Sequence, residues 1–214
     1  MSRYRGPKDR LSRRHDTNLF GAKKNPLDRR RGRGVGAGGS PPGQHGQNRR
    51  SKKSEYGIHL DAKQKFRAYY GMISEAQFRR TFERARGMRA GVTGEVFVGL
   101  LESRLDVMTL RMNFAPNIWA ARQIVTHGHM LVNGKRCNIP SARIMPGDVV
   151  SVREKSRKIP MVFHQFLGSR GTPPSYVEVN QDDFSGKLLH FPEKHEVPFP
   201  GEFNEQLVVE YYSR

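Results

Sequence analysis

The sequence predicts an α+β protein: a helical N-terminal domain with an extended basic arm, and an inserted small module of two helices packed on a short, twisted, antiparallel-type sheet. Three observations predict this class. The first 55 residues are basic and glycine-rich, apolar residues then recur with a helical period, and turn signals later separate short apolar runs. The expected domains are the arm (1–55), the helical domain (56–102), the module (103–165) and an acidic C-terminal segment (166–214). We expect short strands of the last segment to pack back on the helical domain.

The composition of the 214 residues points to a nucleic-acid partner. A hydrophobic fraction of 36% fills a modest core only, and a net charge of +18 is typical of proteins that bind nucleic acid or, less commonly, an anionic membrane. No stretch approaches the ~20 apolar residues of a membrane span, and residues 1–5 lack a signal-peptide core. We therefore expect a protein of the cytosol or of an organelle's matrix. The single cysteine, Cys137, excludes an internal disulfide and is interpreted as a filler in a strand.

The N-terminal arm cannot build a core alone. Residues 1–55 contain sixteen Lys or Arg against four Asp or Glu, with nine glycines, a basic run at Arg29–Arg33 and a Gly/Pro stretch at Val35–Gly46. Leu19 and Phe20 are interspersed, which favours a segment that orders against a partner. RNA would supply the missing counter-charge, and a solvated tail is the alternative.

Two helices are predicted next. The first ends near Gly71, and the second begins at Ser74, whose spacing to Gln77 is that of a capping box. Phe78 and Phe82 lie on its apolar stripe. Its opposite face is basic, and such a face is either solvated or in contact with phosphate.

The module begins with a helix whose apolar stripe runs from Leu101 to Met112 and which ends at Asn113; Arg104 and Arg111 point away from the stripe. A second helix begins at Asn117 and ends at Gly128. The dipeptide Asn133-Gly134 then predicts a two-residue hairpin turn between strands 129–132 and 135–137. A turn at 146–148 precedes a further strand, 149–152.

The last segment reverses the charge. Residues 171–214 contain eight acidic and three basic side chains, and residues 176–179 and 206–212 have the pattern of strands. An acidic end on a basic protein suits contact with another basic protein. A self-packed cap on the basic body is the alternative.

Catalytic and metal chemistry finds little support. His127 and His129 are too few for a metal site, and Gly128 between them is expected to aim the two rings apart, so both are interpreted as donors to RNA. The glycines of residues 36–43 are followed by no Gly-Lys-Ser/Thr, which excludes a P-loop. No nucleophile motif is present. We expect no enzyme and no metal.

Several motifs resemble one known family. Within the module they are Glu102-Ser-Arg-Leu-Asp, Arg111-Met-Asn-Phe-Ala, Ala121-Arg-Gln-Ile-Val, His127-Gly-His, Val132-Asn-Gly-Lys, Asn138-Ile-Pro-Ser and Pro146-Gly-Asp. Outside it they are Arg3-Tyr-Arg-Gly-Pro-Lys, Pro42-Gly-Gln-His-Gly, Tyr56-Gly with Lys63-Gln-Lys, Gly91-Val-Thr-Gly-Glu and Val209-Glu-Tyr-Tyr-Ser-Arg. Over nearly the whole chain the sequence resembles the bacterial small-subunit ribosomal protein S4 family.

The resemblance implies a structural constituent of the small ribosomal subunit in the cytoplasm. It implies binding of 16S rRNA at a multi-helix junction, early in assembly of the 30S body and near the path of messenger RNA. It also implies contact with ribosomal protein S5 that bears on translational accuracy. Many relatives bind zinc through four N-terminal cysteines, which this chain lacks, so no cofactor is expected. No membrane contact and no homo-oligomer are expected.

The expected RNA contacts combine the module with the basic residues before it. They are Arg3, Arg5, Lys8, Arg10, Arg13, Arg14, Gln44, His45, Lys52, Lys53, Lys63, Lys65, Arg79, Arg80, Arg104, Arg111, Asn117, Arg122, Gln123, His127, Asn133, Lys135 and Arg136. Trp119 either stacks or packs against a neighbouring protein. Two other functions remain open: an RNA-modifying enzyme that uses the same module, and a repressor or stress protein that acts on messenger RNA.

Overall fold

The computed structural model describes residues 4–22, 24–28, 43, 44, 46, 52–88, 91–159 and 172–213. Their fold is mixed α+β, which confirms the predicted class. The chain divides into two compact units: unit 1 is Met1–Arg79 with Phe199–Arg214, and unit 2 is Arg80–Pro198. The domain boundaries expected at residues 55, 102 and 165 stay predictions. None of the helices in the described ranges is long and apolar enough to cross a membrane.

Unit 1 is helical where the structure describes it. Its helices are α1 (Lys8–Arg14), α3 (Glu55–Tyr69), the first residues of α4 (Glu75–Gly87) and α9 (Glu205–Ser213). Helix α3 begins at Ser54, whose hydroxyl accepts a hydrogen bond from the Gly57 N–H at 3.2 Å. It ends before Gly71, whose φ of 74° lies in the left-handed region, as the sequence predicts. The Ser74 hydroxyl accepts from the Gln77 N–H at 3.4 Å at the start of α4.

Aromatic side chains form the contact between α3 and the returning C-terminal segment. The rings of Phe199 and Phe203 stack with centroids 4.5 Å apart, and Phe66 of α3 meets Phe203 edge-on at 5.1 Å. Tyr69 of α3 lies 5.3 Å from Phe203. Large rings in such contacts are a major source of stability, so this cluster fixes the last part of the chain against α3.

Two predictions for unit 1 are wrong. Residues 206–212 were expected to form a strand, but they belong to helix α9 because the Asn204 carboxamide accepts from the Gln206 N–H at 3.0 Å and so caps a helix. The arm was expected to be extended, but residues 8–14 form helix α1. Asp9 in its first turn and Arg14 in its last turn both favour the helix dipole. The predictions for Arg29–Arg33 and for most of Val35–Gly46 lie outside the described residues.

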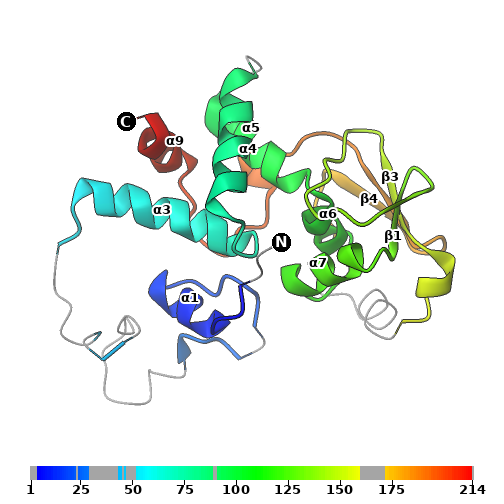
Figure 1. Cartoon of the computed structure of the whole chain (residues 1–214), viewed down its shortest axis with the longest axis horizontal. Helices are drawn as coiled ribbons and strands as arrows, with labels where there is room; N and C mark the ends of the chain where they lie inside the picture. The colour runs from blue at the N-terminus through cyan, green and yellow to red at the C-terminus, as the bar shows by residue number, and fades with distance from the viewer. Residues whose placement is uncertain are drawn as a thin grey trace. The chain divides into compact units, whose positions relative to one another are not determined.

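Unit 2 contains the predicted module. Its helices are α5 (Thr93–Glu102), α6 (Leu105–Arg111) and α7 (Ile118–Thr126), beside the end of α4 and two 3-10 turns (Glu154–Ser156 and Lys194–Glu196). The strands are β1 (Met130–Val132), β2 (Lys135–Cys137), β3 (Val149–Val152), β4 (Val177–Asn180) and β5 (Ser185–Leu188). They form one antiparallel sheet in the order β2-β1-β3-β5-β4, and α6 and α7 lie against it (Figure 1).

The turns of the module adopt the predicted conformations. Asn113 ends the first helix with a φ of 61°. Asn133 and Gly134 have φ values of 49° and 77°, as a hairpin with two left-handed central residues requires.

The strands of the acidic segment join the sheet of the module, which the sequence did not predict; their expected packing on the helical domain stays a prediction. Strand β5 instead pairs with β3, with Val150 opposite Gly186, and β4 pairs with β5. The physical reason is the open edge of β3, whose N–H and C=O groups need partners. The segment thereby widens the sheet of the module.

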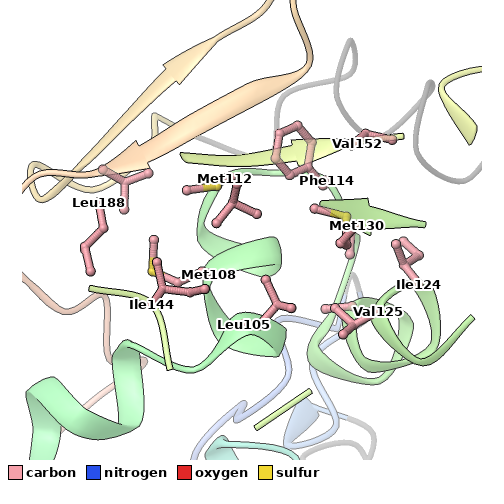
Figure 2. Packing of buried hydrophobic residues seen from close by; sticks show 14 of the residues in the cluster. Leu105, Met108, Met112, Phe114, Ile124, Val125, Met130, Ile144, Val152 and Leu188 are labelled. Carbon is pink, nitrogen blue, oxygen red and sulfur yellow. The ribbon is translucent and has the colours of Figure 1, made fainter. Parts of the chain in front are cut away.

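The core of unit 2 lies between the sheet and the two helices (Figure 2). Leu105 and Met108 of α6, Val125 of α7, and Met130 and Val152 of the sheet belong to this core, and each is at most 1% exposed. Each buried side chain of this size contributes about 1.5–3 kcal/mol. The core therefore holds the two helices rigidly against the strands.

Candidate nucleic-acid interface

A buried carboxylate organises the start of the module. Asp106 in α6 is 0% exposed. Arg104 donates two parallel hydrogen bonds to it, with Nε–Oδ1 and Nη2–Oδ2 distances of 3.0 and 2.9 Å. The Nε of Arg122 in α7 donates to Oδ2 at 3.1 Å. Because a buried charge needs well-placed partners, these two arginines complete a site that joins α7 to the start of α6.

A second buried carboxylate repeats this arrangement. Glu102, at the end of α5, is also 0% exposed. Arg111 donates to it from Nε and Nη2 at 2.8 and 2.9 Å, and the Tyr176 hydroxyl donates at 2.9 Å. Glu102 therefore ties α5 to α6 and to the residue that precedes β4.

We call Arg104, Arg111 and Arg122 the inner arginines. Their side chains are 8%, 9% and 16% exposed, so they are mostly enclosed. The Arg122 guanidinium also lies 5.7 Å from the centroid of the Trp119 ring. Trp119 was interpreted as stacking or as packing against a neighbouring protein, and this contact with Arg122 lies within the chain. The internal ion pairs leave the inner arginines little surface to offer to RNA.

Two asparagines of the predicted interface have structural partners. The Asn117 carboxamide accepts from the N–H groups of Trp119 and Ala120 at 3.1 and 2.9 Å, as the predicted N-cap. The Asn133 carboxamide donates to Asp148 at 2.8 Å and accepts from the Val149 N–H at 2.9 Å. The hairpin turn is thus tied to the Pro-Gly-Asp turn before β3.

Arg136 lies across the turn between α7 and β1. Its Nη2 donates to the carbonyl oxygen of His127 at 3.3 Å. A Cβ atom at Gly128 would lie 2.2 Å from the Arg136 Nε, and the φ of Gly128 is +73°, so glycine suits both the turn and this close approach. Arg136 is itself exposed, and a guanidinium carries five N–H donors, of which the bond to His127 uses one.

Positive charge accumulates around this turn. Burial lowers the pKa of His129 below its usual value, and His127, Arg136 and Arg153 lower it further. The His129 Nδ1 lies 2.9 Å from the Ser156 hydroxyl, and its carbonyl accepts from the Arg153 N–H at 2.9 Å. We call His127, His129, Arg136 and Arg153 the outer basic cluster. Four cationic or titratable side chains in one place can hold phosphate.

The outer basic cluster contains no metal site of the usual kind. The rings of His127 and His129 have centroids 5.9 Å apart, so the prediction that Gly128 aims them apart is wrong. Among the described residues, no group of three or more His, Cys, Asp or Glu side chains could hold a metal. Cys137 lies in β2, partly buried, and packs against the core as predicted.

In unit 1, Lys63 resembles the inner arginines. It is 4% exposed, its Nζ contacts Glu75 at 2.9 Å, and it lies 4.3 Å from the centroid of the Tyr211 ring. The Nζ of Lys65 donates to the carbonyl oxygen of Glu202 at 2.8 Å. These two lysines hold unit 1 together.

The other predicted contact residues differ in accessibility. Those exposed in the structure are Arg5, Lys8, Arg10, Arg14, Gln44, Lys52, Lys53, Arg79, Arg80, Gln123, His127, Asn133, Lys135 and Arg136. Arg13 is half-buried, and Arg3 and His45 lie outside the described residues. The predicted residues up to Arg79 belong to unit 1 and the rest to unit 2. Whether each contacts RNA stays a prediction.

The sequence-based set missed Arg153. Arg153 follows β3 and joins the cluster because β1 and β3 are neighbours, with Met130 opposite Val152. A pairing register, which local sequence patterns do not specify, would have been needed to find it.

The fold and the basic cluster define a protein built on an S4 domain, which is matched at residues 103–150. Residues 3–102 match the domain described as "Ribosomal protein S4/S9 N-terminal domain". Three relatives are each named "Small ribosomal subunit protein uS4", and the alignments cover 100% of both chains. They come from Brevibacillus brevis, Phenylobacterium zucineum and Hyphomonas neptunium and are 50%, 46% and 45% identical to this chain. The chain belongs to the uS4 family of ribosomal proteins, which is not a family of enzymes.

Proposed function

We propose that this protein is a structural constituent of the small ribosomal subunit and binds 16S rRNA directly at a multi-helix junction. Membership of the uS4 family supports the ribosomal role. The outer basic cluster supports the RNA contact, and it is the single observation that carries this part of the proposal. Cytoplasmic ribosomes are the corresponding location.

The cluster suits the backbone of a folded RNA better than a short single-stranded sequence. Arg136 presents an exposed guanidinium, which can bind a phosphate through two parallel hydrogen bonds. His127 lies beside it, and Gln123 and Lys135 are exposed on the neighbouring helix and strand. Aromatic side chains on which successive bases could stack are absent from this group, which favours recognition of shape.

The inner arginines have a different part in the proposal. Their bonds to Asp106 and Glu102 fix α5, α6 and α7, and thereby fix the place of the outer basic cluster. A contact whose parts are already rigid loses less entropy on binding. Arg104, Arg111 and Arg122 are thus assigned to positioning rather than to direct RNA contact.

The remaining parts of the chain extend the proposal. The exposed cations before residue 56 follow rRNA and hold several of its helices together during early assembly of the 30S body. The acidic C-terminal segment contacts a basic protein, S5, and through that contact influences translational accuracy near the path of messenger RNA.

Filter binding to a 16S fragment that contains the junction tests the proposal. We expect an affinity that falls steeply and log-linearly with salt, since each phosphate contact contributes about 0.9 to the slope at most. In cell extracts the protein should sediment with 30S particles. Affinity without salt dependence contradicts rRNA binding, and a protein found free of ribosomes favours a regulator of messenger RNA instead.

A further inference from the structure

Ser156 is a buried serine whose side chain meets the outer basic cluster. It ends the 3-10 turn Glu154–Ser156 that follows β3, and it is 4% exposed. The Ser156 N–H donates to the Arg153 carbonyl at 2.7 Å, and the Arg153 N–H donates to the His129 carbonyl at 2.9 Å. The Ile159 N–H donates to the Ser156 carbonyl at 3.1 Å. These backbone bonds hold Ser156 beside His129.

The hydroxyl of Ser156 determines which ring nitrogen of His129 carries the proton. Its Oγ lies 2.9 Å from the His129 Nδ1, which is the one hydrogen-bond partner of this hydroxyl in the part of the chain that the structure describes. If Nδ1 carried the proton, it would donate to Oγ and leave the hydroxyl hydrogen buried without an acceptor, which costs free energy. The hydroxyl therefore donates to Nδ1, and the proton of the neutral ring lies on Nε2.

The Nε2–H of His129 is a donor that a ligand can reach. Within the described ranges no hydrogen bond involves this nitrogen, and it is not one of the buried side-chain atoms that lack a partner. The ring of His127 lies beside it, with the two ring centroids 5.9 Å apart. One face of the imidazole is thus fixed by Ser156, and the opposite nitrogen is open.

The charged groups around His129 favour an acceptor that carries negative charge. The groups that act on its ring are His127, Arg136 and Arg153, and no carboxylate of the described residues is among them. Burial and these neighbours lower the pKa of His129, so its ring is neutral at neutral pH and above. A neutral ring can direct one hydrogen bond, while Arg136 supplies the charge.

We propose that Ser156 is a positioning residue, which holds the His129 ring so that its Nε2–H donates to a backbone phosphate oxygen of RNA. His129 then contacts the RNA as an oriented neutral donor, and Ser156 acts only through it. The inference rests on the proposed function, which supplies the RNA. It gives a role in that function to an uncharged buried residue.

RNA affinity of two His129 variants of the full chain provides the first test, at about pH 8, where the ring is neutral. His129→Asn should weaken binding to the 16S fragment about tenfold, as loss of a hydrogen bond to a charged group predicts. His129→Gln should recover most of this loss, because a glutamine amide nitrogen can take the place of Nε2 and an asparagine amide only that of Nδ1. The salt slope should stay that of the wild type in both, since a neutral donor releases no counter-ion. Arg136→Gln should instead lower the slope by about one.

The role of Ser156 has two tests of its own. Ser156→Ala should weaken binding about threefold, because the freed ring must be immobilised when RNA binds. Ser156→Thr keeps the hydroxyl and should bind more tightly than Ser156→Ala. Ser185→Ala, which changes a half-buried serine of β5, is the matched control and should bind as the wild type does. NMR of the ring nitrogens of His129 in the free wild-type protein should show the proton on Nε2, and this measurement needs neither a variant nor RNA.

The results separate this inference from the proposed function. Wild-type affinity of His129→Asn, while Arg136→Gln binds weakly, overturns the inference and leaves the proposed function intact. Equal affinities of the two His129 variants, a proton on Nδ1, or wild-type affinity of Ser156→Ala overturn it as well. A lower salt slope in His129→Asn would make His129 a cationic contact, which contradicts a neutral donor. If the wild type lacks salt-dependent rRNA affinity, the proposed function fails and the phosphate contact of His129 fails with it.

Discussion

The inner arginines and the outer basic cluster consist of similar residues within one unit, yet they have different physical roles. Arg104 and Arg111 donate bidentate hydrogen bonds to carboxylates that are 0% exposed. Arg136 donates one 3.3 Å bond to a backbone carbonyl and is exposed. A buried ion pair is costly to break, whereas an exposed cation contributes little to stability and remains available to a partner. Burial and counter-ion, rather than residue type, separate a positioning arginine from a contacting one.

The largest expected effect comes from removing the carboxylate that the inner arginines Arg104 and Arg122 share. Asp106→Asn leaves Arg104 and Arg122 enclosed without their negative charge, and we expect a loss of about 3–5 kcal/mol in the free energy of unfolding. Urea denaturation measures it. Asp182→Asn is the control, because Asp182 is exposed and should change stability by less than about 0.5 kcal/mol. An Asp106→Asn variant as stable as the control would show that the inner arginines do not depend on this carboxylate.

The second-largest effect concerns Arg136 of the outer basic cluster. Arg136→Gln should weaken binding to the 16S fragment about tenfold and reduce the salt slope by about one, while the free energy of unfolding stays within about 0.5 kcal/mol. Filter binding at several salt concentrations measures the first, and urea denaturation the second. Lys187→Gln, an exposed cation of β5, is the matched control and should bind as the wild type does. A loss of stability without a loss of affinity would place Arg136 with the inner arginines.

Local sequence patterns predicted most of the helices, strands and turns of the module. They did not predict which arginines are buried in ion pairs and which are exposed. The hairpin at Asn133-Gly134 and the helix start at Asn117 depend on residues close in sequence, so their patterns were sufficient. The Arg122–Asp106 contact joins residues 16 apart, and its burial depends on how α6 and α7 pack. Arg104 and Arg122 were therefore predicted as RNA contacts from their charge and from the motifs in which they lie.

The C-terminal segment shows the same limit in its secondary structure. The run around Val208 and Val209 favours a strand by propensity, but a cap at Asn204 and burial of Val208 stabilise a helix. Pairing of β5 with β3 joins residues far apart in sequence: Val150 and Gly186 are 36 positions apart. The sequence pattern of the module did not indicate that the edge of β3 was open to a further strand. Tertiary pairing decided both elements.

The smallest expected effect is a change in the pKa of His129, which responds to the positive charge of the outer basic cluster. Burial, then His127, Arg136 and Arg153, hold the pKa of His129 below its usual value of 6.5. A histidine whose pKa is lowered by folding binds its proton more readily in the unfolded chain. Stability should therefore be complete above pH 6.5 and decline as pH falls through the window below it.

Arg136→Gln removes one positive neighbour and should therefore raise the pKa of His129. NMR titration of the His129 ring protons measures this pKa. Bound RNA phosphate should raise the pKa further, because a negative charge favours the imidazolium. RNA binding near pH 6 would then take up a proton and strengthen as pH falls. Lys187→Gln should leave the His129 pKa unchanged. A His129 pKa that is the same with and without RNA would place the phosphates away from the outer basic cluster.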